Sequence, residues 1–580
     1  MILKYCKAVL GRCLLASSRR TTREELIAQD MQRLHTMGYA QELFRAMGGF
    51  SNFAISFTII SVLSGCLTLF YLIPTTSGFA AASIGWPLVT IFVVIVALGM
   101  AELASAYPTA GGLYYWASKL GGAGWGWYTG WFNLIGQVAV TAGIDYGAAV
   151  SIDVLLHAWI PAVPANLASL LLGIDAPTQR TTLLIYAIVL TLHALLNIFG
   201  VRIVAFLNDV SVGWHIVGVC LIAGGVVIAA LIGLQFGGAS GVDFTAPVKH
   251  AIVGLNSAST VFGVDPKFNA TGIPANTPGI PASNPFPEWY VFLLGLLLAQ
   301  YTYTGYDASA HLTEETVGAA TRAPWGVVMS VVVSFFAGYA LLMGLLAAVP
   351  DMVAAGSFIH PVLYILESRL GYLLGTLFFA VAVGAQFFCG MSSITTNSRM
   401  IYAFSRDGAT PFPDVWHRLD RGRTPRNAII LSATAAFILG IPTLFNYPAY
   451  VAITGIATIC LYISYVLPIL LRLFAKDFQR GPWHLGSWSR PIGIIAVLWV
   501  IFIAIVFMLP TYNSFALPVF NYTGVIVLGA LVLLTIWWFV SVRYWFKGPR
   551  IQGSAAELSA IEQSVGETIH VDAEAAAGGQ

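Results

Sequence analysis

Long apolar stretches alternate with short polar ones along almost the whole chain. Twelve of the apolar stretches are each close to the roughly 20 residues that a helix needs to cross a bilayer. We therefore expect an all-α membrane protein with twelve transmembrane helices. The predicted spans are 49–73, 86–106, 125–157, 181–199, 203–233, 289–312, 325–349, 372–403, 427–445, 449–472, 491–510 and 523–546.

The polar segments define the remaining regions. Residues 1–48 are predicted to form a cytoplasmic N-terminal tail, whose last part is an amphipathic lead-in lying on the membrane surface. Residues 234–288, rich in Gly, Pro, Asn and Ser, are predicted to form an extracellular loop, and 404–426 a basic cytoplasmic loop. Residues 547–580 have no apolar periodicity and are predicted to be a disordered cytoplasmic tail.

Composition agrees with this pattern. Of 580 residues, 58% are hydrophobic and 9% charged, against about 25% charged in soluble domains. The net charge of +2, without a basic patch interleaved with aromatics, gives no reason to expect nucleic acid as a partner. None of the six cysteines has metal-ligand spacing, so we expect neither a zinc site nor another cofactor.

Charge also predicts the orientation, because cytoplasmic flanks collect Lys and Arg. With both termini inside, the outer side keeps only Arg180, Lys249, Lys267 and Arg369. The chain is expected to be a multi-pass protein of the plasma membrane, with the lipid bilayer as its surroundings. The Asn-x-Thr sequons at 269–271 and 521–523 then lie outside, and whether they are glycosylated stays open.

The first span contains Ser64 and Gly65 near its middle. A helix broken there would begin its outer half at Gly65 and Cys66, with free N–H groups suited to a carboxylate. The alternative is that Ser61, Ser64 and Gly65 let neighbouring helices approach closely.

The sixth span ends in Gly305, several hydroxyl groups and Asp307. Irregular backbone at membrane depth is tolerated only where protein or a water-filled cavity satisfies it. An intramembrane acid such as Asp307 indicates a functional site, although it is also a residue type that caps helices. Corresponding interruptions in two halves of a chain are the best sequence pointer to a transporter site.

Four motifs give a more specific indication. Together they resemble the amino acid–polyamine–organocation permeases, and within them the amino acid/choline transporter branch that includes GABA permeases. The resemblance covers about residues 38–550. The motifs are Ser51–Gly65, Met100–Tyr115, Thr313–Thr316 with Ala323-Pro324, and Ser398–Pro411.

The resemblance implies a five-plus-five inverted repeat with broken helices 1 and 6. The first repeat would be 49–233 and the second 289–472, with two extra helices in 473–546. After the first span the branch usually has Gly-Gly-Pro, whereas residues 73–83 lack it. Substrate preference at the outer mouth therefore does not carry over from the branch.

The resemblance also implies roles for site residues. Ser64, Gly65 and Cys66 would hold the substrate carboxylate. Thr304, Gly305, Tyr306 and Asp307 would form the break of the sixth span, whose upper half ends in carbonyls suited to an amine. Tyr301 matches a position that often carries a gating aromatic, and packing is the alternative role for it.

His215 in the fifth span lies where many relatives carry a lysine that is taken to replace a sodium ion. Histidine titrates near physiological pH, so His215 is a candidate coupling residue and protons are a candidate coupling ion. A neutral histidine, hydrogen-bonded within the bundle, is the alternative. At the cytoplasmic ends, Glu102, Glu314 and Glu315 are predicted to pair with loop arginines, and 406–408 to act as a gate or clamp.

The pattern as a whole favours a secondary active transporter that moves small amino acids or GABA by alternating access, coupled to protons or by exchange. One alternative is a carrier of choline, polyamine or another organic cation, which would need an acid near the amine. Another is an amine-sensing receptor or channel without coupled turnover. An enzyme is not expected, because no nucleophile–base pair, metal spacing or phosphate loop is found.

Overall fold

The computed structural model describes residues 22–159, 178–199, 201–236, 255–263, 286–356, 358–420, 422–445, 448–511, 520–554 and 556–563. In this part the chain is helical, with an isolated β-bridge between Met47 and Thr316. The predicted all-α class is confirmed.

Eleven helices in the described residues are long and apolar enough to cross a membrane, and they coincide with eleven of the twelve predicted spans. The remaining span, 289–312, consists of the short helices α14 (Glu288–Gly295), α15 (Leu297–Thr302) and α16 (Ala308–His311). Each is too short to cross a bilayer alone, because about 20 residues are needed. The structure thus has one long membrane helix fewer than the twelve predicted spans, because the sixth span is divided where the sequence predicts a break.

The other helices follow in chain order. The first half contains α2 (Arg23–Thr36), α3 (Gly49–Ile60), α4 (Val62–Thr68), α5 (Leu72–Thr75), α6 (Ala80–Ser83), α7 (Gly85–Ala106), α8 (Gly112–Gly121), α9 (Ala123–Trp159), α11 (Gln179–Phe199), α12 (Val201–Leu231) and α13 (Ala258–Val261). The second half contains η2 (Thr313–Glu315), α17 (Ala319–Ala348), α18 (Met352–Gly356), α19 (Pro361–Arg406), α20 (Pro413–Trp416), α21 (Arg426–Gly440), η3 (Ile441–Leu444), α22 (Pro448–Phe474), η4 (Gly486–Trp488), α23 (Ser489–Met508), α24 (Tyr522–Trp537), η6 (Trp538–Val542) and α25 (Arg543–Trp545).

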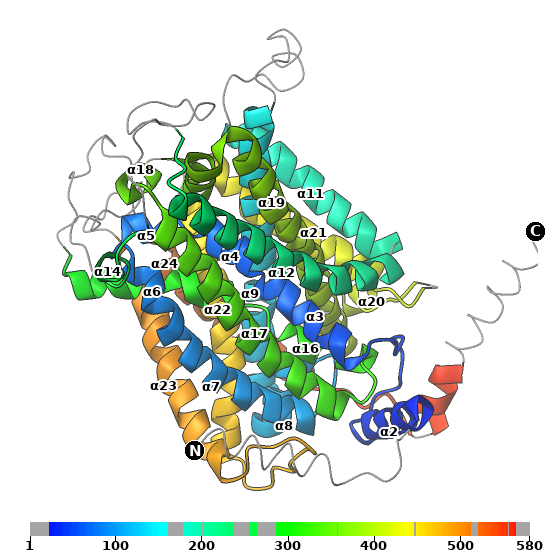
Figure 1. Cartoon of the computed structure of the whole chain (residues 1–580). Helices are drawn as coiled ribbons and strands as arrows, with labels where there is room; N and C mark the ends of the chain where they lie inside the picture. Colours follow the sequence, from blue (N-terminus) through cyan, green and yellow to red (C-terminus); the bar gives the residue numbers. More distant parts are fainter. Residues whose placement is uncertain are drawn as a thin grey trace, which may run out of the picture.

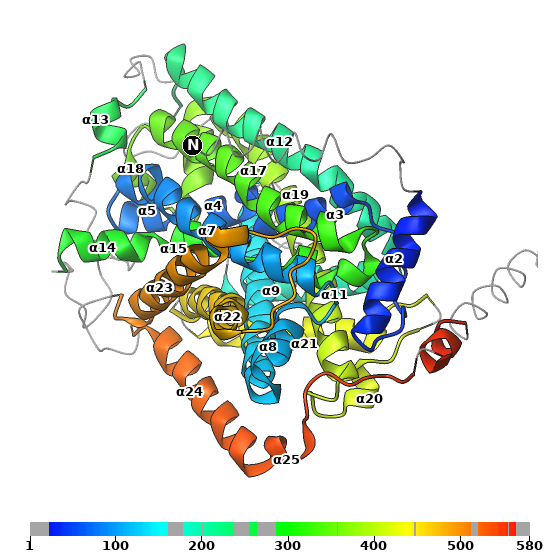
Figure 2. The same ribbon diagram turned by 90° about the horizontal axis from the view of Figure 1, so that it is seen from below.

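Helices α9 and α22 form the centre of the bundle. They pack against each other, and α9 also packs against α19, α8 and α11 (Figures 1 and 2). Helix α24 lies at the edge of the bundle. Leu533 of α24 and Val540 of the following η6 are both exposed. Exposed apolar side chains on peripheral helices are what a lipid-facing surface requires.

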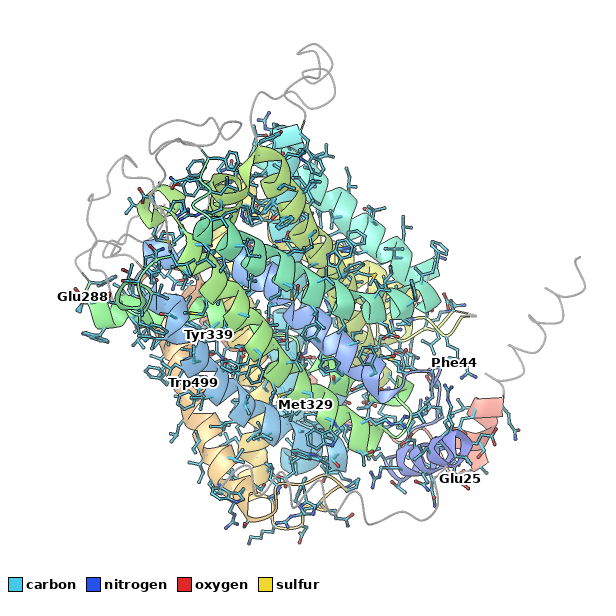
Figure 3. All side chains as sticks on the ribbon, viewed as in Figure 1. Glu25, Phe44, Glu288, Met329, Tyr339 and Trp499 are labelled. Carbon is cyan, nitrogen blue, oxygen red and sulfur yellow. The ribbon has the colours of Figure 1, made fainter. Side chains whose placement is uncertain are left out.

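Charged side chains lie toward the ends of the bundle. Figure 3 shows Glu25 and Glu288 on opposite sides of the view, with Met329, Tyr339 and Trp499 between them. This distribution fits a protein whose middle zone is surrounded by hydrocarbon.

Two helical segments differ from the prediction. Helix α19 begins eleven residues before the predicted span 372–403 and is kinked at Gly371, where φ is 75° and glycine is favoured. In the tail predicted to be disordered, residues 556–563 are helical, and Glu562 Oε1 lies 2.8 Å from His35 Nε2. The sequon at 269–271 lies outside the described residues.

Candidate functional site

The first transmembrane segment is broken at Ser61, between α3 and α4. Ser61 has a left-handed backbone (φ 36°), and its Oγ accepts a hydrogen bond from the Ser64 N–H at 3.2 Å. Its carbonyl accepts from the N–H groups of Ser64 (2.9 Å) and Gly65 (2.8 Å). The predicted break at Ser64 and Gly65 is therefore three residues too late, because both N–H groups already belong to the first turn of α4. The N–H groups at the start of α4, without partners inside the helix, are those of Val62 and Leu63.

The sixth segment is broken at the predicted place. Residues 303–307 separate α15 from α16, and Gly305 has φ 102°, a value that L side chains rarely adopt. The carbonyls that end α15 are partly occupied. Those of Leu298 and Tyr301 each accept a hydroxyl group at 2.7 Å, from Thr302 and Thr304 respectively.

The two breaks lie against each other. A Cβ added to Gly305 would overlap the Ile59 side chain, with Ile59 Cβ only 2.9 Å away. A Cβ added to Gly65 would lie 2.5 Å from Thr302 Oγ1. The small residues of the first segment thus do both things that the sequence suggested: they lie beside a helix break, and they allow close approach.

Asp307 is fully buried, and its carboxylate is directed away from the backbone of its own helix. Gln137 Nε2 donates to Oδ2 at 2.8 Å, Asn133 Nδ2 donates to Oδ2 at 3.2 Å, and the Tyr465 hydroxyl donates to Oδ1 at 2.8 Å. His311 Nε2 lies 3.3 Å from Oδ2. Asp307 makes no side-chain cap bond to α16, so the capping interpretation is wrong. The acid is instead held by residues of α9 and α22.

Several buried polar atoms around the second break make no hydrogen bond of ordinary geometry within the described residues, although the Tyr462 hydroxyl interacts with the Tyr306 hydroxyl and the Gln300 side chain. They are both side-chain amide atoms of Gln300 and the hydroxyls of Tyr301, Tyr306 and Tyr462. Buried polar groups are normally satisfied, so a cluster of unsatisfied ones is a reason to expect a polar ligand here. Sequence reasoning missed Gln300 and Tyr462, although Gln300 begins the polar end of an otherwise apolar run.

Tyr301 lies at the boundary between the break and α9. A Cβ added to Gly143 of α9 would lie 2.6 Å from the Tyr301 hydroxyl. The position suits a side chain that closes over a ligand, and its role as a gate stays a prediction.

His215 lies directly beside the first break. Its Nδ1 is 2.7 Å from the Ser211 carbonyl, and its Nε2 is 2.7 Å from Ser61 Oγ. Because Nδ1 can meet a carbonyl only as a donor, the neutral ring accepts the Ser61 hydroxyl at Nε2. Cys389 of α19 approaches the same break, since its thiol donates to the Ile59 carbonyl at 3.1 Å. His215 is thus hydrogen-bonded within the bundle and also in contact with the break.

The end of the bundle that carries α2 is closed by a polar network, here called the terminal seal (residues 39–45, 313–316, 399–407 and 550–552). Glu314 pairs with Arg406 at 3.1 Å and Glu315 with Arg399 at 2.8 Å, so both acids pair with arginines, although Arg399 belongs to a predicted span and not to a loop. Glu102 instead accepts hydrogen bonds from the Leu485 N–H and the Ser489 hydroxyl. Arg45 donates to the carbonyls of Thr313 and Thr316.

Asp407 joins both ends of the chain to this seal. It accepts hydrogen bonds from the hydroxyls of Tyr39 (2.8 Å) and Tyr114 and from the Arg550 N–H (2.9 Å). Burial raises the pKa of the Asp407 carboxyl, and the nearby Arg406 guanidinium opposes this rise. The network therefore holds several groups whose charges are costly unless paired.

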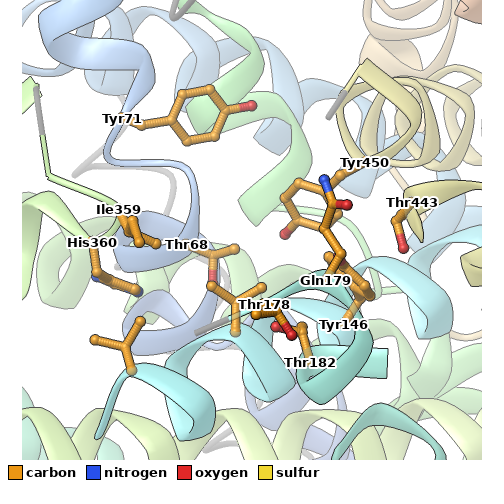
Figure 4. A pocket seen from close by; sticks show the side chains of 13 residues that line it. Thr68, Tyr71, Tyr146, Thr178, Gln179, Thr182, Ile359, His360, Thr443 and Tyr450 are labelled. Atoms are coloured by element: carbon orange, nitrogen blue, oxygen red, sulfur yellow. The ribbon is translucent and has the colours of Figure 1, made fainter. Parts of the chain in front are cut away.

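A cavity of about 200 Å³ opens at the other end of the bundle. Thr68 at the end of α4 lines it, together with Tyr146 of α9, Thr182 of α11, His360 before α19 and Tyr450 of α22 (Figure 4). A larger cavity, of about 710 Å³, lies beside the terminal seal and is lined by Ile55, Glu315 and Arg399 among others, so the bundle is hollowed at both ends. Among the described residues, no cluster of His, Cys, Asp or Glu side chains is arranged to hold a metal ion.

Comparison with known proteins agrees with this geometry. The family model described as "Amino acid permease" matches residues 47–532. The chain is 38% identical to "Amino-acid permease BAT1" of Arabidopsis thaliana, over 89% of this chain and 95% of that protein. It is 37% identical to "Amino-acid permease BAT1 homolog" of Oryza sativa subsp. japonica, over the same shares. A "Putative polyamine transporter" of Candida albicans is 26% identical over 92% of this chain and 91% of that protein. The chain belongs to the amino acid permease family of membrane transporters.

Proposed function

We propose that this permease is a secondary active transporter that moves a small zwitterionic amine, an amino acid or GABA, across the plasma membrane by alternating access. The observation that carries the proposal is the contact between two helix breaks, Gly305 against Ile59 and Gly65 against Thr302. Opposed helix ends offer partial charges of both signs without a charged side chain, which suits a substrate with opposite charges at its two ends.

The carboxylate of the substrate binds at the start of α4. The N–H groups of Val62 and Leu63 supply the donors, and the helix dipole favours negative charge there. Ser64, Gly65 and Cys66 form the rest of this turn, and Gly65 leaves the approach open because it has no side chain. These residues are all buried within the bundle.

The amine binds at the second break. The Thr304 carbonyl supplies a peptide oxygen, since those of Gly305 and Tyr306 already accept from the Ala308 N–H and the Ser56 hydroxyl. The Gln300 amide and Tyr306 hydroxyl lie nearby. Asp307 acts through its charge, because its oxygens already accept bonds from Gln137, Asn133 and Tyr465. Tyr301 closes over the bound molecule.

Alternating access requires the two ends to open in turn. We assign the terminal seal to the cytoplasmic face and the cavity beside Tyr146 to the outer face, and the ion pairs of the seal would separate when the inner face opens. Coupling uses His215. A proton on Nε2 would convert that atom from a hydrogen-bond acceptor to a donor. The Ser61 hydroxyl could then no longer donate to it, which would change the hydrogen bonds of Ser61, the residue at which the first segment breaks.

A second candidate is a carrier of polyamine or another organic cation. The buried Asp307 at the amine end and the name of the Candida albicans relative favour it. Against it, the start of α4 would offer its N–H groups to a substrate without a carboxylate.

Counterflow in proteoliposomes tests the proposal. Vesicles loaded with unlabelled alanine or GABA are expected to accumulate the labelled compound, and external choline or spermidine to leave this unchanged. Protein-free vesicles are the control. Accumulation that requires choline or spermidine would favour the cation carrier, and absence of any exchange-stimulated accumulation would favour a channel or receptor.

A further inference from the structure

Asp145 of α9 and His193 of α11 form an ionisable pair inside the bundle, separate from the breaks. His193 Nδ1 lies 3.2 Å from Asp145 Oδ2, and both side chains are 0% exposed. Ionisable residues at membrane depth are costly, and those that persist usually belong to ion or proton pathways. No part of the binding arrangement described above uses this pair.

Helix α19 covers the pair so closely that a side chain at residue 390 would displace it. A Cβ added to Gly390 would overlap Asp145 Oδ1 and lie 2.7 Å from His193 Cε1. On the same helix, the Phe387 ring lies edge to face with the His193 ring at 4.4 Å between centroids. The pair is therefore shielded by backbone and an aromatic ring.

The pair has unused capacity for one proton. Among the described residues, Asp145 Oδ1 and His193 Nε2 have no hydrogen-bond partner. With the imidazole neutral and its Nδ1–H donating to Oδ2, the Nε2 lone pair is free and the pair carries one negative charge. A proton added at Nε2 forms an N–H bond and makes the pair neutral overall, and its departure breaks the same bond.

The other titratable groups near the pair do not change charge in the same range of pH. Tyr186 of α11, Tyr301 of α15 and Cys389 of α19 each interact electrostatically with Asp145, and Tyr450 of α22 donates to the neighbouring Gly143 carbonyl. Tyrosine and cysteine are uncharged below about pH 8 at their ordinary pKa values. Asp145 has no ion-pair partner other than His193 in the described part of the chain.

Two structural connections lead from the pair to the substrate site. On α19, Gly390 covers the pair, while the preceding residue, Cys389, donates to the Ile59 carbonyl at the first break. On α9, Asn133 and Gln137 hold Asp307, and Asp145 lies about two turns beyond Gln137 on the same helix. A change of charge at the pair thus acts on the same two helices that hold both breaks.

We propose that Asp145 and His193 together bind the proton that moves with the substrate. The inference rests on the proposed transport function and adds a second ionisable site to His215. In net transport the pair takes up a proton with the substrate from one side and releases it to the other, whereas exchange can proceed with the proton bound throughout.

The test compares net proton movement with exchange in proteoliposomes. An internal pH-sensitive dye reports proton entry on addition of alanine or GABA, and counterflow reports exchange. Three substitutions on three helices disturb the pair. Asp145→Asn and His193→Gln each remove one of its ionisable groups, and Gly390→Ala places a methyl group against it. For each we expect loss of substrate-evoked proton entry to the level of protein-free vesicles, with counterflow retained.

His157→Gln is the matched control. His157 also pairs with an aspartate of α9, Asp153, at 3.1 Å, but its side chain is 21% exposed. This variant is expected to keep both activities. Retained counterflow shows that a variant has folded.

Each outcome has a defined meaning. Wild-type proton entry in the variants that show counterflow would overturn the proposal, as would counterflow by the wild type without any proton entry. A wild type that lacks counterflow would instead contradict the proposed function. A measurement on the wild type needs no variant: in weakly buffered detergent solution, substrate binding must change the number of bound protons, and no change would overturn the proposal.

Discussion

The break site and the terminal seal are joined where α16 leads into η2, but they are held together in opposite ways. At the breaks, the geometry depends on glycines that contact neighbouring side chains. The one acid there, Asp307, accepts hydrogen bonds from uncharged donors and lies beside a histidine. At the seal, buried ion pairs such as Glu314 with Arg406 join the segments.

The difference follows from where water is available. Charges separated at the end of a bundle are hydrated again, whereas charges separated at membrane depth are not. A gate that opens can therefore use ion pairs, while a substrate site in the middle of the bilayer is better made of peptide groups. Four substitutions test this contrast.

Gly65→Leu should have the largest effect. A side chain at residue 65 would collide with Thr302 and separate the two breaks, so we expect loss of uptake with normal surface expression. Gly213→Leu is the matched control, because nothing lies within 4 Å of a Cβ at that exposed position. Normal uptake by the residue 65 variant would remove the proposed carboxylate site.

Arg406→Gln tests the seal. It leaves Glu314 buried and unpaired, and breaking a buried pair costs about 3–5 kcal/mol, so the melting temperature of the purified protein should fall. The double variant with Glu314→Gln should recover much of this loss. Arg418→Gln, at an exposed position, should melt like the wild type. Equal melting of the two single variants would show that the pair does not stabilise the closed end.

Asp307→Asn removes a charge while preserving shape. Because the Asp307 oxygens bond Gln137, Asn133 and Tyr465, the charge acts on the substrate without a hydrogen bond, and we expect substrate affinity to fall by roughly tenfold, about 1.4 kcal/mol. Asp351→Asn is the comparison, because Asp351 does cap a helix, accepting from the N–H groups of Val353 and Ala354, and it should leave affinity unchanged. Wild-type binding by the residue 307 variant would mean that its charge is not used.

His215→Ala should have the smallest effect on maximal uptake and a specific effect on its pH profile. The Ser61 hydroxyl would lose its acceptor at Nε2, so the dependence of uptake on pH should flatten. Uptake measured from about pH 5 to pH 8 checks this, with His417→Ala as the control in the loop after α19. An unchanged profile would assign coupling elsewhere.

Much of the fold was predictable because apolar length alone identifies membrane helices. The second break was also predictable, since Gly305 lies among hydroxyl groups where nothing else interrupts the apolar run. The first was placed three residues late. The turn is made by Ser61, a residue type that seldom adopts a left-handed backbone, and only its cap bond to Ser64 reveals why it does so here.

Some of the residues that bond Asp307 could have been predicted from the sequence. Asn133 and Gln137 are polar residues four positions apart in an apolar span, which indicates one polar face. What they face depends on how α9 packs against α16 and α22. The same holds for Asp145 and His193, which are 48 residues apart and meet only because α9 and α11 lie side by side.

The contact of the C-terminal segment with the terminal seal has a practical consequence for shortened forms of the protein. The Arg550 N–H donates to Asp407, Ile551 packs on Gly38, and the Gln552 N–H donates to the Gly38 carbonyl. A chain that stops at Trp545 would lack all three contacts and would favour the state open at that end. Affinity tags and reporter domains should therefore follow residue 563, where they leave this closure intact.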